Sequence, residues 1–327
     1  MQRALVTGGT GFIGSNLARA LLERGWNVRI LRRPNSDLRA IGKAAVEHVI
    51  GDVTDGDSLE QAMRGCDTVF HTAAIVSYWK RERKRMYEVN IGGTQNVVEA
   101  CRAAGVAKLV HTSSIAAVGP TPPGVLADES TPFLWEAYDV GYRISKYRAE
   151  LEVRKGIERG LFAVMVSPSV VIGPGDIHFH GGQLIRDVYK KRIFYYPEGG
   201  LNIVYVDDVV RAEIAAAERG ESGERYLATG TNLTHREALE VIAEVVGGIM
   251  PFIKLPAALA RGIAGTAEMV AAITGTRPWV TRELIAGIGM NSWFSSDKAI
   301  RELGYTVTPF REAVSKTFDW YRRNDLL

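Results

Sequence analysis

The first 33 residues constrain the fold more than any other part of the chain. An apolar run at residues 3–7 is followed by three glycines spaced three apart, Gly8, Gly11 and Gly14. Apolar residues then recur at helical spacing until Gly25, and a second apolar run covers residues 26–33. We therefore predict a strand, a glycine turn, a helix over residues 15–24 and a second strand, which together form a β-α-β unit.

The glycine turn has the form that a dinucleotide pyrophosphate requires. A pyrophosphate binds backbone N–H groups at a helix N-terminus, and only glycine lets the backbone come close enough. We expect Gly8 to make the turn, Gly11 the close approach and Gly14 the helix–strand contact. Ordinary loops also contain glycine trios, but the flanking strands favour a cofactor site. The predicted contacts include the neighbouring residues Thr10, Phe12 and Ile13.

The end of the second predicted strand distinguishes between the two nicotinamide dinucleotides. An acidic residue there binds the ribose 2′-hydroxyl of NAD, whereas an arginine pairs with the 2′-phosphate of NADP. This chain has Leu31, Arg32 and Arg33, with no acidic residue before Asp37. We predict NADP, with NAD as the alternative, and expect Arg32 to be the main contact and Arg33 a second. A solvated Arg-Arg-Pro turn is the competing interpretation.

Strands and helices continue to alternate along the next 90 residues. Apolar runs predict strands at 47–55, 68–74 and 108–119, and helical spacing predicts helices at 58–65 and 86–104. This order is typical of a doubly wound parallel sheet of the Rossmann type, which binds its ligand outside the carboxyl ends of the strands. We expect four residues at those ends to contact the cofactor: Asp52 and Val53 at the adenine, and Ala73 and Ala74 at the pyrophosphate and ribose.

A strongly basic hexapeptide, KRERKR, occupies residues 80–85. Such a run is usually a solvated loop or helix face. The alternative is that it attracts an anionic substrate tail or an acidic lipid surface.

Tyr142 and Lys146 stand four residues apart in a helical pattern, which puts them on one face of the helix. A free tyrosine titrates near ~10, and a neighbouring cation favours the phenolate and lowers that pKa. Thr112, Ser113 and Ser114 follow an apolar strand and offer a hydroxyl that could polarise a carbonyl. These residues predict a proton-transfer site.

The glycine motif TGGTGFIG, the TSS strand end and the YRISK helix occur together and in this order. The chain thereby resembles the extended short-chain dehydrogenase/reductase superfamily over essentially its whole length. The resemblance implies that Ser114, Tyr142 and Lys146 are catalytic, with Ser113 as a neighbouring candidate, and that Tyr142 and Lys146 also contact the cofactor. It further implies a cofactor-facing loop at 165–176, with Pro168, Ser169 and Val171 near the nicotinamide.

Three branches of this superfamily differ at individual positions. Ile115 and Ala116 stand where nucleotide-sugar dehydratases have an Asp-Glu pair, and the segment 201–208 lacks the arginine typical of nucleotide-sugar epimerases. The chain therefore resembles the branch of dihydroflavonol 4-reductase and 3β-hydroxysteroid dehydrogenases, and also sugar-epimerase-like proteins linked to hopanoid synthesis. This implies an NADP-preferring oxidoreductase that interconverts a ketone and a secondary alcohol on a fairly apolar small molecule. The alternatives are a sugar or nucleotide-sugar epimerase and a non-catalytic cofactor-sensing scaffold.

We predict an α/β protein with two parts. Residues 1–165 form the NADP-binding Rossmann domain. Residues 166–327 form mainly a smaller α/β substrate lobe, with segments at about 200–230 returning to the Rossmann domain. The apolar stretch 251–274 is interrupted by charges and does not fit a spanning helix. It is either a packed helix or a lid or interfacial segment, so peripheral membrane contact stays open.

The remaining candidates carry weaker signals. His178 and His180 alternate as metal ligands do, but no partner set completes a site, so we predict loop residues near the substrate and no metal. Four aromatic residues could line the substrate pocket or simply pack: Tyr189, Phe194, Tyr195 and Tyr196.

Composition sets limits on partners and compartment. The net charge is only +3, which argues against a dedicated nucleic-acid binder. Cys66 and Cys101 form neither a disulfide framework nor a zinc motif, and no export signal precedes the first strand, so we expect a cytoplasmic protein. The resemblance implies a homodimer through the helices at 86–104 and 138–155.

Overall fold

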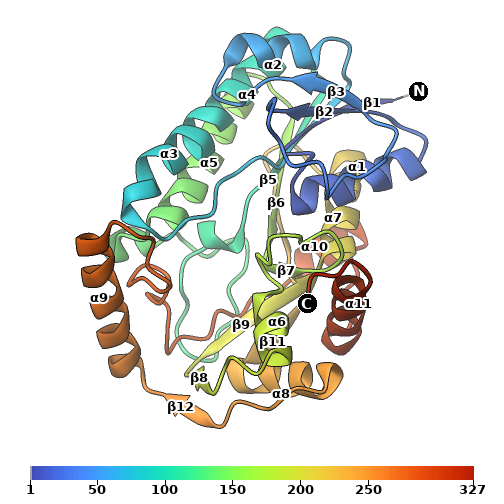
Figure 1. Cartoon of the computed structure of the whole chain (residues 1–327). Helices are drawn as coiled ribbons and strands as arrows, with labels where there is room; N and C mark the ends of the chain where they lie inside the picture. Colours follow the sequence, from blue (N-terminus) through green and yellow to red (C-terminus); the bar gives the residue numbers. More distant parts are fainter. Residues whose placement is uncertain (1) are drawn as a thin grey trace.

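A parallel sheet of seven strands forms the centre of the larger half of the molecule (Figure 1). The computed structural model describes residues 2–327 of the chain. In spatial order the strands are β3 (Glu47–Ile50), β2 (Asn27–Arg32), β1 (Arg3–Thr7), β4 (Thr68–His71), β5 (Lys108–Thr112), β6 (Ala163–Pro168) and β10 (Arg225–Ala228). The order reverses between β1 and β4, which is the doubly wound arrangement predicted from the sequence.

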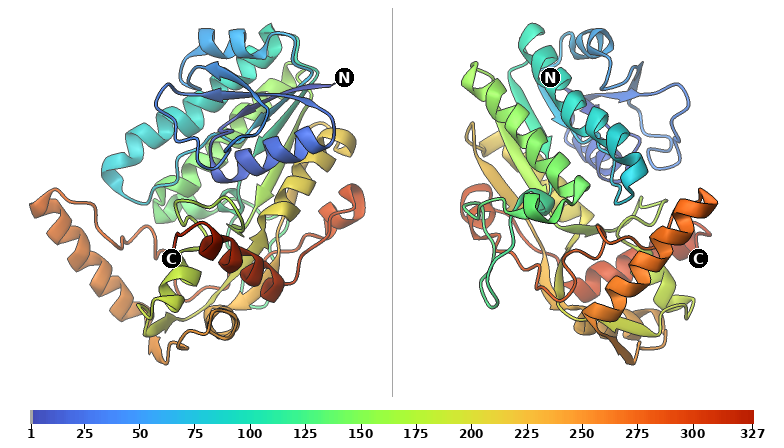
Figure 2. Two further views of the ribbon diagram at one scale, coloured as in Figure 1. Left: turned by 45° about the vertical axis from the view of Figure 1, so that its right-hand side comes forward. Right: turned by 90° about the vertical axis from the view of Figure 1, so that its left-hand side faces the viewer.

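Helices cover both faces of this sheet (Figure 2). One face packs against α1 (Phe12–Glu23), α7 (Val206–Arg219) and α10 (Asp297–Leu303). The other packs against α2 (Gly56–Met63), α4 (Gly93–Ala103) and α5 (Gly141–Glu158). The central strands are apolar on both sides because both faces are buried: Leu5 contacts one layer and Val6 the other.

The smaller half is built around a three-stranded sheet of β11 (Thr231–Thr234), β9 (Gly200–Tyr205) and β7 (Val170–Ile172). Its core packs against α6 (Gln183–Tyr189), α8 (His235–Val246) and α11 (Phe310–Arg323). A two-stranded sheet of β8 (Tyr195–Pro197) and β12 (Ile253–Leu255) leads to α9 (Ala257–Thr274), which lies on the outside of the molecule (Figure 1).

More segments of the C-terminal half return to the large sheet than the sequence predicted. The expected division at residue 165 falls inside β6, and β10 joins the large sheet beside β6. A second returning segment was not predicted: Ala299, Leu303 and Tyr305 are buried in the core of the large sheet. The hydrophobic pattern of α10 fits any buried helix, so only the packing reveals which core it joins.

Several predicted boundaries are wrong by a few residues. The first helix begins at Phe12, directly after the glycine turn. The strands predicted at 47–55, 68–74 and 108–119 end at Ile50, His71 and Thr112, because polar and small residues then leave the ladder. The predicted helix 86–104 consists of α3 (Arg83–Tyr87), a π-helical turn (Glu88–Gly92) and α4. Among the described residues no helix is long and apolar enough to cross a membrane.

Candidate active site

The glycine turn joins β1 to α1 at the carboxyl edge of the large sheet. Gly8 has a φ of +69°, which favours glycine, and a Cβ on Gly14 would lie 2.3 Å from the Gly8 carbonyl oxygen. The first turn of α1 follows Gly11 with neither a side-chain cap nor an acidic residue. Its N–H groups can therefore bind an anion, and the geometry fits a dinucleotide pyrophosphate.

A cavity of about 350 Å³ adjoins this turn. Thr10, Gly11 and Phe12 line one side of it, and the loop around residues 175–180 lines the other. His178 and His180 belong to that loop, so they lie beside the glycine turn. No group of three potential metal ligands occurs within residues 2–327.

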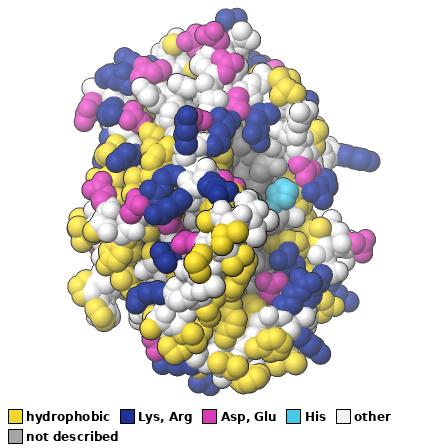
Figure 3. Space-filling model, turned by 60° about the vertical axis from the view of Figure 1, so that its left-hand side comes forward, with side chains coloured by type: hydrophobic (Ala, Val, Ile, Leu, Met, Phe, Trp, Pro, Cys, Tyr) yellow, Lys and Arg dark blue, Asp and Glu magenta, His cyan; other side chains and the backbone are white. Residues whose placement is uncertain are grey.

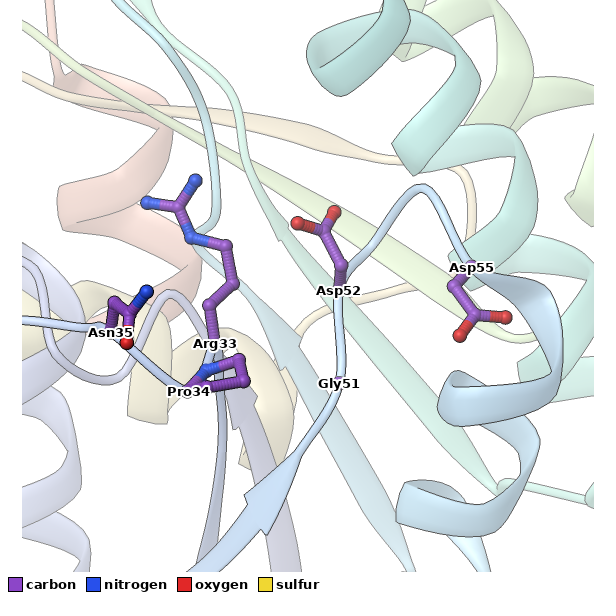
Figure 4. Close-up of a pocket in the computed structure, with 6 residues that line it drawn as sticks. All are labelled: Arg33, Pro34, Asn35, Gly51, Asp52 and Asp55. Carbon is purple, nitrogen blue, oxygen red and sulfur yellow. The ribbon is translucent and has the colours of Figure 1, made fainter.

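A larger cavity of about 620 Å³ lies beyond the ends of β2 and β3. Arg33 and Asp52 face each other across it (Figure 4). Burial acts to raise the pKa of Asp52, but two hydrogen bonds from Thr54 outweigh it and lower the pKa overall. Arg85 approaches the same carboxylate, with a nitrogen–oxygen distance of 3.9 Å. An ionised carboxylate and the Arg33 guanidinium thus line the cavity where the adenine was expected.

The side chains of the two adjacent arginines have different surroundings. Arg33 lines both cavities, whereas Arg32 lines neither. The Nε of Arg32 donates to His48 Nδ1 at 3.2 Å, and its Nη1 approaches the carbonyl oxygens of Arg33 and Pro34. The Arg33 side chain thus borders both cavities, whereas the Arg32 guanidinium is engaged by His48 and by backbone carbonyls.

The other predicted cofactor residues lie at the same edge of the sheet. Ala73 follows β4 and its backbone nitrogen lies 3.4 Å from Thr7 Oγ1, while Ala74 is exposed beside it. Val53 is buried next to Gly93 at the start of α4. Ile13 is half-buried in the first turn of α1. The later candidates end β6 and begin β7: Pro168 and Ser169 are buried, and Val171 is half-buried.

Tyr142, Ser114 and Lys146 come together near the N-terminus of α5. Burial raises the pKa of Tyr142 above its ordinary value, and a hydrogen bond with Ser114 acts in the opposite direction. Lys146 is buried one turn along the helix, and its Nζ donates to the Thr112 carbonyl oxygen at 2.8 Å. Burial also lowers the pKa of Lys146 to about 8, against the charges of Glu150 and Glu213. The Tyr142 phenol and the Ser114 hydroxyl thus share one site, and the Lys146 ammonium lies one helical turn further on, at the end of β5.

The two candidate serines differ in their hydrogen-bond partners. Ser113 Oγ donates to the buried Glu150 carboxylate at 2.5 Å. Ser114 instead caps the short 3₁₀ turn at 115–117, accepting from the Ala116 N–H at 3.1 Å, and it retains contact with Tyr142. Of the two hydroxyls, that of Ser114 is the one that acts on the pKa of Tyr142.

An ion-pair cluster missed by the sequence analysis holds the start of α5. Glu283 accepts from the Gly141 N–H at 2.8 Å and from Arg83 Nη2 at 2.6 Å. Arg83 also binds Asp139, at 2.7 Å from both its carboxylate and its carbonyl oxygen. Arg83 belongs to the basic run at 80–85, so that run is not simply a solvated face. Glu283 carries no local sequence signal, because it lies 142 residues from its partner Gly141.

Asn90 is a second residue that the sequence did not identify. Its side chain exchanges hydrogen bonds with Ile75 after β4 and donates to Ser145 Oγ on α5 at 2.9 Å. Asn90 lies in the π-helical turn between α3 and α4, and such turns often occur at functional sites. It ties the loop after β4 to the helix that carries Tyr142.

The aromatic candidates of the C-terminal half lie on its surface or pack within it. The Tyr189 ring contacts Phe318 of α11, at 5.1 Å between centroids. Phe194 and Tyr195 are exposed, and Tyr196 packs partly into the core of the smaller half.

The chain matches the model of the NAD dependent epimerase/dehydratase family over residues 4–228. It is 34% identical to a Synechocystis protein named after dihydroflavonol 4-reductase, with 98% of this chain and 94% of that protein covered. It is also 34% identical to sterol demethylase protein B of Methylococcus capsulatus, with 99% of each covered. A farnesyl-dihydroquinoline-oxide ketoreductase of Stigmatella aurantiaca is 32% identical, with 93% and 92% covered.

Solved structures agree over the whole chain. The crystal structure of gox2253 superimposes with a TM-score of 0.88 at 39% identity, covering 100% of both chains. A nucleoside-diphosphate-sugar epimerase from Pseudomonas aeruginosa gives a TM-score of 0.83 at 26% identity, covering 100% of this chain and 99% of that one.

Proposed function

The chain belongs to the NAD dependent epimerase/dehydratase family, and from this premise we propose that it is an NADP-preferring oxidoreductase. Its substrate would be a fairly apolar small molecule in which it interconverts a ketone and a secondary alcohol. The observation that carries this proposal is the contact of Ser114 with Tyr142, one helical turn before Lys146. The identity to proteins named as reductases, near one third over nearly the whole chain, supports it.

Each side chain of this site has a distinct role in the proposed reaction. The nicotinamide group, when bound, supplies or accepts the hydride. Tyr142 gives its hydroxyl proton to the carbonyl oxygen during reduction and takes it back during oxidation. Ser114 donates a hydrogen bond that orients this oxygen. Lys146 stabilises the phenolate left on Tyr142, because a cation lowers the cost of the negative charge.

The cofactor preference rests on Arg33. Its guanidinium lines the cavity at the end of β2, where a 2′-phosphate would form charge-assisted hydrogen bonds. Asp52 across the cavity accepts hydrogen bonds and is suited to the adenine amino group. The glycine turn and the first turn of α1 would bind the pyrophosphate.

Net consumption of NADPH tests the reaction class. We expect the purified protein to consume NADPH in proportion to the ketone reduced, across a panel of apolar ketones followed at the nicotinamide absorbance. The similarity to a nucleoside-diphosphate-sugar epimerase supports the competing function. An epimerase returns the hydride to its substrate, so inversion of a nucleotide sugar without any net change in absorbance would refute the reductase proposal.

We propose peripheral membrane contact through the outer face of α9. Leu259, Met269 and Ile273 are 56%, 60% and 82% exposed, and the helix spacing puts them on one side, away from Arg261 and Glu268. Arg81 approaches the Ala272 carbonyl at the C-terminal end of this helix. Figure 3 shows Lys and Arg side chains gathered next to hydrophobic ones on the face turned forward there. This combination suits an anionic bilayer surface.

Vesicle sedimentation tests this contact. We expect binding to vesicles of equal phosphatidylcholine and phosphatidylglycerol to weaken at least about tenfold in the double variant Met269→Asp, Ile273→Asp, because burying charge in the acyl boundary is unfavourable. Ile300→Asp is the matched control, since Ile300 is exposed on α10 and lies on another surface. Unchanged sedimentation of the double variant would reject the contact and leave α9 as a lid or a packed helix.

Two further proposals follow from the sequence and the family. We propose a homodimer through α4 and α5, and light scattering of the purified protein measures its mass. The free cysteines Cys66 and Cys101 are both buried, which is compatible with the proposed cytoplasmic location. Cell fractionation tests that location.

A further inference from the structure

Arg143 follows Tyr142 directly in the chain, and its charge is not balanced by any carboxylate. The Arg143 side chain is half-buried. Among residues 2–327 no hydrogen bond or ion pair involves its guanidinium. The groups that act on its charge are the phenols of Tyr78 and Tyr142. Burial lowers the pKa of Arg143, because a guanidinium without a partner is poorly solvated there.

The position of Arg143 in its helix makes this charge still less favourable. It is the third residue of α5, whose first turn contains no acidic residue. The N-terminus of a helix carries partial positive charge, so a cation there is repelled and an anion is attracted. Glu283 accepts from Gly141 but is already paired with Arg83. The end of α5 therefore retains excess positive charge beside the reactive phenol.

Contacts with aromatic rings fix the guanidinium in place. Its central carbon lies 3.6 Å from the centroid of the Trp135 ring, and the indole is itself held by a hydrogen bond of 2.8 Å to the Val118 carbonyl. The Tyr78 ring lies against Tyr142, at 5.6 Å between centroids. A stacked guanidinium uses its face and leaves its N–H edge free for an acceptor in the same plane. The surroundings are aromatic, so this acceptor belongs to an otherwise apolar molecule.

We propose that Arg143 binds a carboxylate of the substrate, so that the substrate is an apolar keto acid or hydroxy acid whose acid group lies near the reacting carbon. A carboxylate accepts two parallel N–H bonds from one guanidinium and neutralises its single charge. A phosphate dianion would leave charge unbalanced at a site with one arginine. This substrate class rests on the proposed oxidoreductase function and narrows it.

Pairs of substrates that differ in their carboxylate charge test whether Arg143 binds a carboxylate. The probes are 2-oxo-2-phenylacetate, 3-benzoylpropionate and 4-benzoylbutyrate, each compared with its methyl ester, with NADPH in excess. We expect wild type to prefer at least one acid over its ester, and Arg143→Leu to lower kcat/KM for that acid about 100-fold while leaving the ester within about threefold. Arg143→Lys keeps the charge without the planar fork, so its kcat/KM for the acid should lie between the values of wild type and Arg143→Leu.

Arg148→Leu is the matched control, since Arg148 is exposed on the same helix. This substitution should change kcat/KM for neither the acid nor the ester. Thermal unfolding separates recognition from a structural role: loss of an unbalanced cation should leave the midpoint of Arg143→Leu unchanged or higher. A lower midpoint with equal losses for acid and ester would overturn the proposal. The proposal would also be overturned if wild type did not distinguish acids from esters, or if it preferred dihydroxyacetone phosphate over all three acids.

Calorimetry distinguishes failure of this inference from failure of the proposed function. If wild type reduces none of the ketones, binding of the acids to the protein with NADP⁺ still decides the inference. Binding that Arg143→Leu abolishes would support the carboxylate site although the reductase proposal had failed. Absence of binding by all three acids would overturn it. Reduction of neutral ketones without any effect of Arg143→Leu would leave the function intact and reject the carboxylate site.

Discussion

Tyr142→Phe is expected to lower kcat for ketone reduction about 1000-fold while the dissociation constant for NADPH changes less than about threefold. General acid catalysis by a positioned side chain contributes about 10²–10⁴-fold, and phenylalanine keeps the ring but has no proton to give. The ring also keeps its contact with Tyr78, so the site should stay assembled. Stopped-flow rates with NADPH, together with fluorescence titration of the cofactor, measure both quantities.

Tyr147→Phe is the control for this substitution. Tyr147 lies on the same helix, but its ring stacks on Phe133 at 4.2 Å between centroids. Removal of its hydroxyl should leave kcat unchanged. A Tyr142→Phe protein with nearly normal turnover would remove Tyr142 as the acid and leave the proton transfer to another group.

Arg33→Ala is expected to weaken NADPH binding about 100-fold and leave NADH binding unchanged. A charge-assisted pair with a phosphate contributes roughly 1.5–3 kcal/mol, and about 1.4 kcal/mol corresponds to a factor of ten. The effect should be confined to NADPH because only that cofactor carries the 2′-phosphate. Titration of each cofactor against wild type and variant gives the four dissociation constants.

Arg32→Ala is the matched control, since Arg32 is the adjacent arginine and its guanidinium contacts His48 and backbone carbonyls. It should change NADPH binding by less than about threefold. A larger loss in Arg32→Ala than in Arg33→Ala would restore Arg32 as the main contact. Equal affinity of wild type for NADPH and NADH would reject the NADP assignment for both residues.

Local patterns in the sequence were sufficient to predict the architecture. The glycine spacing at Gly8, Gly11 and Gly14 and the alternation of apolar runs predicted a doubly wound parallel sheet, and the structure has that sheet. Spacing of four residues also put Tyr142 and Lys146 on one helix face, and both belong to α5. Strand ends were less predictable, because a strand stops where its neighbour stops, and the neighbour is distant in the sequence.

The sequence by itself determined the β-α-β unit, the family and the set of candidate catalytic residues, because periodicity and short spacings are written within a few turns of chain. Only the tertiary structure showed that Arg33 lines the cavity at the end of β2 and that Arg32 does not, since neighbouring side chains at a strand end point in different directions. It also paired Arg83 with Glu283, 200 residues away, and left Arg143 without a carboxylate beside Tyr142. Whether a charge is balanced depends on what the folded chain brings next to it, and no local pattern records that.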